Sequence, residues 1–298
     1  MAEIIVVGAA IVDVIARPVT EKVFETGSAP MEDIRMTTGG DALNEALILA
    51  KLGKSVRLET IVGDDEAGKL VTEKCKEHGL FIEERQKRKD IPTGINVVLV
   101  EENGERNFLT NPKGTLRALK AEDIQTPFEE NAKILCFASI FVFPGIGAKE
   151  LAHLFSEAKS QGMLVCADMT KRKKNETVEE MKEALSFVDY LFPNEEEACL
   201  LTGEKDAESA AESLLAAGVK NVIIKCGKRG CYVRNEEEAY MVPAKRNVRC
   251  IDTTGAGDSF AAGFVCALSE GKSLRECAEF ANECGARAVE VTGAAEWL

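Results

Sequence analysis

The feature of this chain that most restricts its fold is an alternation of short apolar, β-rich runs with longer helical stretches. The apolar runs span residues 4–7, 56–62, 134–137, 163–167, 188–192 and 222–226. Stretches with helical spacing lie between several of them, at residues 42–52, 67–78, 147–161, 177–185 and 207–217. Such alternation indicates βαβ units. We therefore expect an α/β fold of three layers, with a mainly parallel central sheet covered by helices on both faces.

Two segments interrupt this alternation. Residues 12–38 contain no convincing helix, and residues 94–112 are typical of a β-hairpin that turns at Asn103–Gly104. We expect the two segments to pair into a small accessory sheet. Because ligands bind beyond the carboxyl ends of the strands in open α/β sheets, a sheet added there would act as a lid. The sequence has no separating linker, so we predict a single domain over residues 1–298.

Composition narrows the class of protein. The chain has 298 residues, of which 45% are hydrophobic, enough for a large core. It has no apolar run of about 18 residues, so we expect no membrane-spanning helix. A net charge of −13 argues against a nucleic-acid partner, which requires a basic surface. The start lacks the basic segment of a signal peptide and the ten cysteines form no C-x-x-C pair, so we expect reduced thiols in a cytoplasmic protein.

The segment DTTGAGDSFAAG, residues 252–263, combines flexible backbone with acids at the start of an apolar helical stretch. Gly255 and Gly257 fall in or just before the first turn, where each glycine costs roughly 0.5–1 kcal/mol relative to alanine. A ligand that approaches bare backbone N–H groups would justify them, and a helix N-terminus suits an anion. An anion alone does not explain Asp258 in the same turn.

A second glycine pair lies directly before a predicted helix in TTGGDALNEALILAKLG, residues 37–53. An ordinary turn would use Gly39 and Gly40 with Asp41 as the helix cap. Asn44 favours a binding site instead, because a polar amide in the first turn faces whatever the glycines admit. Asp13, after the first strand and turn, is equally suited to a site or to solvent. The first turn lacks G-x-G-x-x-G, which makes a dinucleotide site unconvincing.

Two further motifs follow predicted strands. In PNEEEA, residues 193–198, three glutamates favour a helix start. Asn194 and Glu197 have a spacing that also suits the water shell of Mg²⁺. In KCGKRG, residues 225–230, Gly227 and Gly230 flank a tight turn between two strands. Alone this turn is a hairpin, whereas beside a nucleotide it would be a backbone platform.

Taken together, these motifs resemble the PfkB or ribokinase family of small-molecule kinases, and the pattern is closest to its bacterial sugar kinases of unassigned substrate. The resemblance covers nearly the whole chain and implies a ribokinase-like fold with a β-sheet lid. It implies that Gly255, Ala256 and Gly257 form an anion hole for the transferred phosphoryl group. Asp258 would be the catalytic base that accepts the proton of the substrate hydroxyl.

The resemblance also implies the remaining site residues. The substrate would be held by Asp13, Gly39, Gly40 and Asn44, and the nucleotide by Lys225, Gly227, Gly230 and Asn282. Asn194 and Glu197 would orient Mg²⁺ through water, and Asp252 and Thr254 are weaker candidates for a monovalent cation such as K⁺. The segment ADMTKR is similar to the D-x-N-x-R segment of fructokinase-like and ketodeoxygluconate kinase-like members, with Thr170 in place of Asn. Its Arg172, if it is not simply solvated, would contact a ketose or an acidic sugar.

These observations favour an ATP- and Mg²⁺-dependent kinase acting on a primary hydroxyl of a ketose, aldose or sugar acid, as a homodimer formed through the lid. One alternative is a nucleoside kinase of the same fold, which would need aromatic side chains around a base. The segments that form the lid offer Phe24 and Phe108. Another alternative is a non-catalytic sugar-sensing protein, which would be favoured if the base or the anion hole were missing.

Overall fold

The computed structural model describes residues 2–102 and 105–298, and an eight-stranded sheet runs through its centre. The strand order is β14-β13-β12-β11-β10-β9-β1-β4. All neighbours from β12 to β4 pair in parallel, and β13 and β14 continue the sheet antiparallel at one edge. The strands are β1 (Ile4–Val7), β4 (Val56–Glu59), β9 (Ile134–Ile140), β10 (Leu164–Met169), β11 (Tyr190–Leu191), β12 (Asn221–Lys225), β13 (Cys231–Arg234) and β14 (Ala239–Val242).

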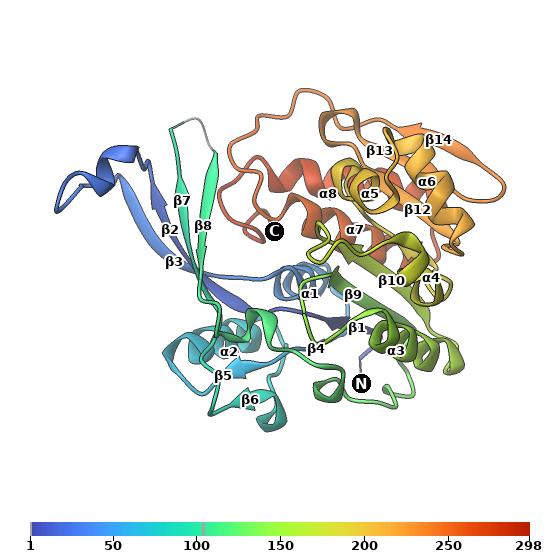
Figure 1. Cartoon of the computed structure of the whole chain (residues 1–298), viewed down its shortest axis with the longest axis horizontal. Helices are drawn as coiled ribbons and strands as arrows, with labels where there is room; N and C mark the ends of the chain where they lie inside the picture. Colours follow the sequence, from blue (N-terminus) through green and yellow to red (C-terminus); the bar gives the residue numbers. More distant parts are fainter. Residues whose placement is uncertain (1, 103–104) are drawn as a thin grey trace.

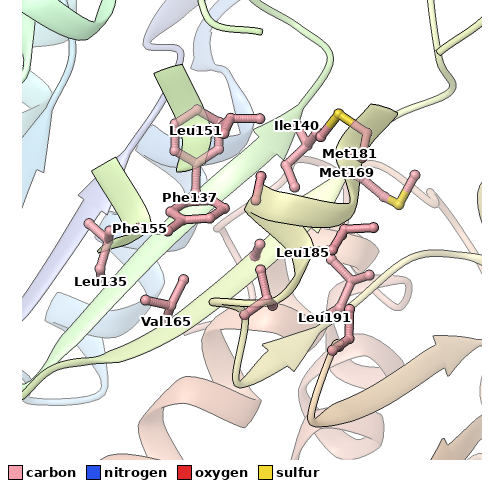
Figure 2. Close-up of a cluster of buried hydrophobic side chains, with 14 of the residues drawn as sticks. Leu135, Phe137, Ile140, Leu151, Phe155, Val165, Met169, Met181, Leu185 and Leu191 are labelled. Atoms are coloured by element: carbon pink, nitrogen blue, oxygen red, sulfur yellow. The ribbon is translucent and has the colours of Figure 1, made fainter. Parts of the chain in front are cut away.

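Helices cover both faces of this sheet, and each face has its own hydrophobic core. One face carries α3 (Ala148–Ser160), α4 (Val178–Leu185), α5 (Glu195–Thr202) and α6 (Ala207–Ala216). The other carries α1 (Asp41–Lys51), α2 (Glu66–Glu77), α7 (Ala256–Ser269) and α8 (Leu274–Ala288). Strand β1 serves both cores, because successive side chains point to opposite faces: Ile5 and Val7 to the first core, Ile4 and Val6 to the second. Figure 2 shows part of the first core, where Phe137 packs edge-on against Phe155.

A separate four-stranded sheet, which we call the lid sheet, projects from the side of the molecule in Figure 1. Its order is β3-β2-β7-β8, formed by β2 (Ile11–Arg17), β3 (Asp33–Gly39), β7 (Ile95–Val100) and β8 (Arg106–Thr110). Strands β2 and β7 pair in parallel, which joins the two interrupting segments as expected. Strands β7 and β8 form the expected hairpin, but its turn at Asn103–Gly104 lies outside the described residues.

The remaining elements are short. Strands β5 (Val62–Gly63) and β6 (Lys87–Arg88) form a two-stranded ribbon. Single 3₁₀ turns span Glu21–Phe24, Glu84–Gln86, Thr115–Arg117, Ala121–Asp123 and Gly227–Arg229. No helix in the described part of the chain is long and apolar enough to cross a membrane.

The predicted α/β fold with a mainly parallel sheet is confirmed, and two local predictions are corrected. The apolar run 56–62 is two strands, β4 and β5, rather than one. The run 188–192 gives only the two-residue strand β11. The alternative of an ordinary turn with Asp41 as the helix cap is not observed: Gly40 occupies the N-cap position and the Asp41 carboxylate accepts a hydrogen bond from Ser139. The ten cysteines, all within the described residues, are free thiols.

Candidate active site

A cavity of about 600 Å³ lies between the lid sheet and the carboxyl ends of the central strands. Loops that follow parallel strands converge at this edge, so residues distant in sequence meet there. The lid sheet contributes Asp13, Ile15, Asn96, Val98, Arg106 and Phe108. The opposite wall includes Gly40, Asp41 and Asn44 at the start of α1, and Thr253, Thr254, Gly255 and Asp258 at the start of α7. The cavity therefore joins the two glycine motifs that the sequence singled out.

Asn44 and Asp258 are in direct contact across 214 residues of sequence. The Asn44 Nδ2 donates to Asp258 Oδ2 over 2.6 Å, because α1 and α7 pack side by side with their N-termini at the cavity. Burial, with the neighbouring Asp41 carboxylate, raises the pKa of Asp258 well above its usual range, while Asn44 and Lys225 oppose the shift. A buried carboxyl with a raised pKa is a stronger proton acceptor, which suits a general base.

The backbone before α7 has the conformation that its glycines allow. Gly255 is the N-cap, with φ +69° in the left-handed region, and a Cβ there would lie 2.5 Å from Ala294. The Ala256 N–H donates to Thr253 O over 3.3 Å, a long bond. The first turn of an α-helix has no intrahelical partners for its N–H groups, so this turn offers donors to an anion.

The lid side of the cavity carries a polar pair, Asp13 and Asn96, on adjacent strands. Asn96 Nδ2 donates to Asp13 Oδ1 over 3.1 Å. Burial raises the pKa of Asp13 to about 6, although the Asn96 bond and the charge of Arg106 lower it. A Cβ at Gly39 would overlap the Asp13 carboxylate, so a side chain there would displace Asp13 from its position beside the cavity. Gly40 has φ +96° and a Cβ there would lie 2.5 Å from Ala9 O.

Carboxyl groups crowd beneath the cavity. Asp41 and Glu45 are both on α1, and burial raises the pKa of each. For Glu45 the neighbouring Asp168 and Asp258 carboxylates raise the pKa further. Cys136 donates its thiol to Glu45 Oε2 over 3.1 Å, whereas the buried Glu45 Oε1 has no hydrogen-bond partner. Unpaired carboxyl charge at this density is unfavourable in the absence of a cation.

Lys225, the last residue of β12, is the cation that lies among these acids. Its Nζ is 2.5 Å from Asp168 Oδ2, at the end of β10. Burial lowers the pKa of Lys225, but Asp168, Glu197 and Asp258 more than offset this effect, so the pKa is raised and the amine stays charged. The Nζ lies 3.5 Å from the point where a Cβ on Gly257 would be. Lys225 therefore reaches the predicted anion hole from the turn that was predicted to bind the nucleotide.

Arg106 bridges the lid sheet and the loop before α7. Its guanidinium donates to the hydroxyl of Thr254 and, over 2.6 Å, to that of Thr253, and lies 3.8 Å from Asp252 Oδ1. Asp252 in turn accepts bonds from the Thr254 N–H and hydroxyl and from Gly293 N. The positive charge beside Asp252 and Thr254 is thus that of an arginine, and a monovalent cation at these two residues stays a prediction.

Asn194 and Glu197 cap α5. Asn194 Oδ1 accepts from the Glu197 N–H and Glu197 Oε2 accepts from the Asn194 N–H, each over 2.8 Å. The single side-chain oxygen of Asn194 and one of the two carboxylate oxygens of Glu197 thus accept capping bonds, which suits a metal held through water better than direct coordination. Within residues 2–102 and 105–298, no group of three His, Cys, Asp or Glu side chains is arranged to hold a metal ion.

The other predicted nucleotide residues lie in and beside the β12–β13 turn. Gly227 has φ +57° and Gly230 φ +101°, and a Cβ on Gly230 would lie 2.5 Å from Ala244 N. Asn282 on α8 donates to Val242 O over 3.1 Å and so ties α8 to the end of β14. The β12–β13 turn has the tight backbone that a nucleotide platform requires. The side-chain amide of Asn282, by contrast, is bonded to the end of β14.

Arg172 lies apart from these groups. It follows β10, is half-buried, and its Nη1 donates to Glu176 O over 2.9 Å. It is not among the described residues that line the 600 Å³ cavity. A contact between Arg172 and a sugar stays a prediction.

Several residues of the site were not predicted from the sequence: Asn96, Arg106, Asp168, Glu45 and Ser139. The sequence could have indicated Asp168, because it ends an apolar strand at the edge of the sheet where ligands bind. It could also have indicated Asn96, which is a polar residue in the otherwise apolar run INVVLV. It could not have indicated Arg106, because its contacts are formed with residues 147 and 148 positions away.

Comparisons with known proteins agree with this geometry. A model of the pfkB family of carbohydrate kinases matches residues 1–298. A ribokinase of Schizosaccharomyces pombe is 26% identical over 310 residues, covering 99% of this chain and 94% of the relative. A probable fructokinase-5 of Arabidopsis thaliana is 28% identical over 272 residues, covering 86% and 83%.

The fold has a matching solved structure, that of Arabidopsis thaliana ribokinase complexed with ribose and ATP. It is 25% identical, with a TM-score of 0.81 over 100% of this chain and 95% of that one. The predicted ribokinase-like architecture is confirmed. With the family model matched over its whole length, the chain belongs to the pfkB family of carbohydrate kinases, phosphotransferases that use an alcohol group as acceptor.

Proposed function

We propose that the chain is an ATP-dependent kinase that phosphorylates a primary hydroxyl of a sugar by in-line phosphoryl transfer. The observation that carries this proposal is the bond from Asn44 to Asp258 at the wall of a cavity that the lid sheet closes from the other side. A sugar there meets a base, a polar amide and the N-terminus of α7 at once. Phosphoryl transfer requires such positioning and charge stabilisation, without a covalent intermediate.

In this proposal Asp258 accepts the proton of the attacking hydroxyl, and Asn44 orients the carboxylate. The N–H groups of the Gly255–Ala256–Gly257 turn stabilise negative charge that develops on the transferred group. Asp13, Gly39, Gly40 and Asn44 hold the sugar, and Gly227, Gly230 and Asn282 lie along the nucleotide. Residues 1–298 work as one ribokinase-like domain, since the lid sheet and the loop before α7 share one cavity.

Mg²⁺, when bound with the nucleotide, neutralises part of the phosphate charge. Asn194 and Glu197 are the residues that would orient its water shell. A K⁺ requirement, through Asp252 and Thr254, is the weaker part of the proposal, because Arg106 already provides positive charge there. Free thiols are stable in a reducing compartment, so we propose a cytoplasmic location.

The charges of the cavity favour a neutral sugar. Its charged lining consists of Asp13, Asp41, Glu105, Asp258 and Arg106, so carboxyl groups outnumber the cation. A ketose or aldose meets less repulsion there than a sugar acid. The alternative of a sugar acid depends on a contact with Arg172. A nucleoside kinase has less support, because Phe108 is the aromatic residue of the described lining and Phe24 is 83% exposed. The base and the anion-binding turn both argue against a non-catalytic sensor.

A homodimer through the lid sheet is supported by the face turned away from the cavity. By the strand register, Ile34, Met36 and Leu109 share that face, and they are 66%, 63% and 56% exposed. An apolar sheet face of this kind is typical of an interface. Sedimentation equilibrium at micromolar concentration tests it; a fully active monomer would contradict the dimer but leave the kinase proposal intact.

The kinase proposal is tested by an acceptor screen that measures ADP formation from ATP with pentoses, hexoses, ketoses, sugar acids and nucleosides. We expect acceptor-dependent ADP formation with a neutral sugar and a phosphorylated sugar by mass spectrometry. Activity with nucleosides alone would identify the chain as a nucleoside kinase instead. ATP binding with no acceptor-dependent turnover across the screen would contradict the proposal.

A further inference from the structure

The ion pair between Asp168 and Lys225 is one of the most deeply buried features of the site. The two side chains are 7% and 16% exposed, and Nζ and Oδ2 are 2.5 Å apart. They come from the ends of β10 and β12, which β11 separates in the sheet. Asp168 Oδ1 accepts from Met169 N over 2.7 Å, which fixes the carboxylate relative to the backbone. The pair therefore holds a flexible lysine side chain in one position.

That position is the mouth of the predicted anion hole. The Lys225 Nζ is 3.5 Å from the Cβ that an alanine would have at residue 257. An ammonium group has three N–H donors, and one of them is directed at Asp168. The others remain to meet an anion at the start of α7. A free lysine side chain populates many rotamers, and an anchoring carboxylate restricts them before the ligand arrives.

We propose that Lys225 contacts the terminal phosphoryl group of the nucleoside triphosphate and that Asp168 is the positioning residue that holds Lys225 there. The inference rests on the proposed kinase function and adds to it which phosphate is bound and which residue prepares the contact. Asp168 would act through Lys225 and would not itself touch the nucleotide.

The direction of the change in ATP affinity on Asp168→Asn distinguishes positioning from simple charge repulsion. Asp168 is an acid beside an anion-binding site, so its charge alone repels a triphosphate. Simple electrostatics thus predicts that Asp168→Asn binds ATP more tightly. Positioning predicts the reverse, because the lysine loses its anchor. Weaker ATP binding by Asp168→Asn is therefore the result that positioning of Lys225 predicts and that charge repulsion alone does not.

The chain supplies a matched control in Asp189. This buried acid also pairs with lysines, Lys159 at 2.6 Å and Lys220 at 2.8 Å, and lies at the amino end of β11, opposite the site. Asp189→Asn removes a buried carboxylate charge of the same kind without touching the cavity. Thermal unfolding of each variant shows that it is folded before binding is measured.

The experiment is calorimetric titration of wild type and variants with ATP and with ADP, in Mg²⁺ buffer at pH 8. Burial raises the pKa of Asp168 to about 7, so at pH 8 its carboxylate is mostly ionised. We expect Lys225→Met to weaken ATP at least tenfold and ADP less than threefold, because only ATP has the terminal group. Asp168→Asn should weaken ATP about three- to tenfold and ADP little. Lys225→Arg, which keeps the charge, should retain part of the preference for ATP.

The double variant distinguishes positioning from an independent effect. With Lys225 already replaced, Asp168→Asn should not weaken ATP further. Tighter ATP binding by Asp168→Asn, additive losses in the double variant, or an equal loss for Asp189→Asn would overturn the inference. So would equal losses for ATP and ADP in Lys225→Met. If nucleotide binding follows the expectation but no sugar is phosphorylated, only the proposed kinase function is contradicted. If the wild type binds neither ATP nor ADP, both the kinase function and the positioning role of Asp168 are contradicted.

Discussion

Strand β12 has a lysine at each end, and each lysine pairs with a buried aspartate. At the amino edge of the sheet, Asp189 accepts from Lys159, Lys220 and the Val165 N–H. At the carboxyl edge, Asp168 pairs with Lys225. Burial disfavours both carboxylates, but the bonds at Asp189 prevail and lower its pKa, whereas burial prevails at Asp168 and raises its pKa to about 7.

The difference lies in what surrounds each pair. Two lysines share Asp189, and both reach solvent, with side chains 27% and 60% exposed. Lys225 alone faces Asp168 together with Glu197 and Asp258, so its charge is divided among several acids. The first pair is satisfied and stabilises the fold. Around the second pair the acids outnumber the lysine. Such a site suits a metal cation, or a phosphate group that binds together with a metal cation.

The largest effect is expected at the carboxyl edge, for Asp258→Asn. This variant keeps the shape and the Asn44 contact but loses the proton acceptor, and loss of a general base costs about 10²–10⁴ in rate. We expect kcat to fall by at least that range while ATP affinity, measured by calorimetry, changes little. A variant that keeps more than about a tenth of the wild-type kcat would exclude Asp258 as the base.

The next effect is on stability and should be larger at the amino edge. Asp189→Asn removes the acceptor of two ammonium groups and is expected to lower the free energy of unfolding by about 2 kcal/mol. Asp168→Asn is expected to cause a smaller loss, because burial already raises the pKa of the Asp168 carboxyl and because Glu197 and Asp258 still face the Lys225 ammonium group. Urea unfolding at pH 7 measures both. A larger loss for Asp168→Asn than for Asp189→Asn would reverse the comparison.

The two acids should also give opposite pH dependences of stability. Unfolded aspartate titrates near 3.8, and folded Asp168 near 7, so between these values the native state holds a proton that the unfolded state lacks. Asp168 thus makes stability fall as pH rises from about 4 to 7, by up to about 1.4 kcal/mol per pH unit. Asp189 has a depressed pKa, so its contribution is present above its usual pKa and is lost on acidification.

Urea unfolding of wild type and both variants from pH 3 to 8 checks this expectation. The Asp168→Asn difference from wild type should grow between pH 4 and 7. The Asp189→Asn difference should shrink as the pH falls below about 4. Parallel curves for all three proteins would mean that neither carboxyl has the environment described.

The smallest effect is expected at Arg172. Its guanidinium is bonded to Glu176 O and lies outside the cavity lining, so Arg172→Ala should change kcat/KM for a neutral sugar less than about twofold. Steady-state kinetics with a neutral sugar and a sugar acid tests it. A tenfold rise in KM confined to the acid, about 1.4 kcal/mol, would support the sequence-based hypothesis of acid recognition.

Much of the fold was predictable because it depends on local pattern. Strand β1 has the predicted bounds, and the predicted helices match α1, α2, α3, α4 and α6 within one residue at each end. The two segments without helices became the lid sheet. The run 188–192 was predicted as one strand, but only Tyr190 and Leu191 form strand pairs. Val188 and Phe192 are buried outside the strand, so their apolar character does not indicate strand pairing.

The site was predictable only as separate motifs. The glycine turns and Asp258 follow from local backbone and from the resemblance, but the contact from Asn44 to Asp258 depends on α1 and α7 packing side by side. Likewise, nothing in the sequence near Lys225 indicates Asp168, since strand order determines which strand ends are neighbours. The bond from Ser139 to the Asp41 carboxylate could not be predicted either, because Ser139 lies at the end of β9.

The most direct test is the ratio of variant to wild-type kcat/KM for ATP for Asp168→Asn and Asp189→Asn, assayed side by side with the best sugar from the acceptor screen. Both changes replace a buried carboxylate by an amide of the same shape. We predict that Asp168→Asn retains about a third of the wild-type kcat/KM for ATP or less, in line with its weaker ATP binding, and that Asp189→Asn retains more than half. Equal ratios, or a lower ratio for Asp189→Asn, would contradict the claim that the pair at the carboxyl edge serves catalysis and the pair at the amino edge serves the fold.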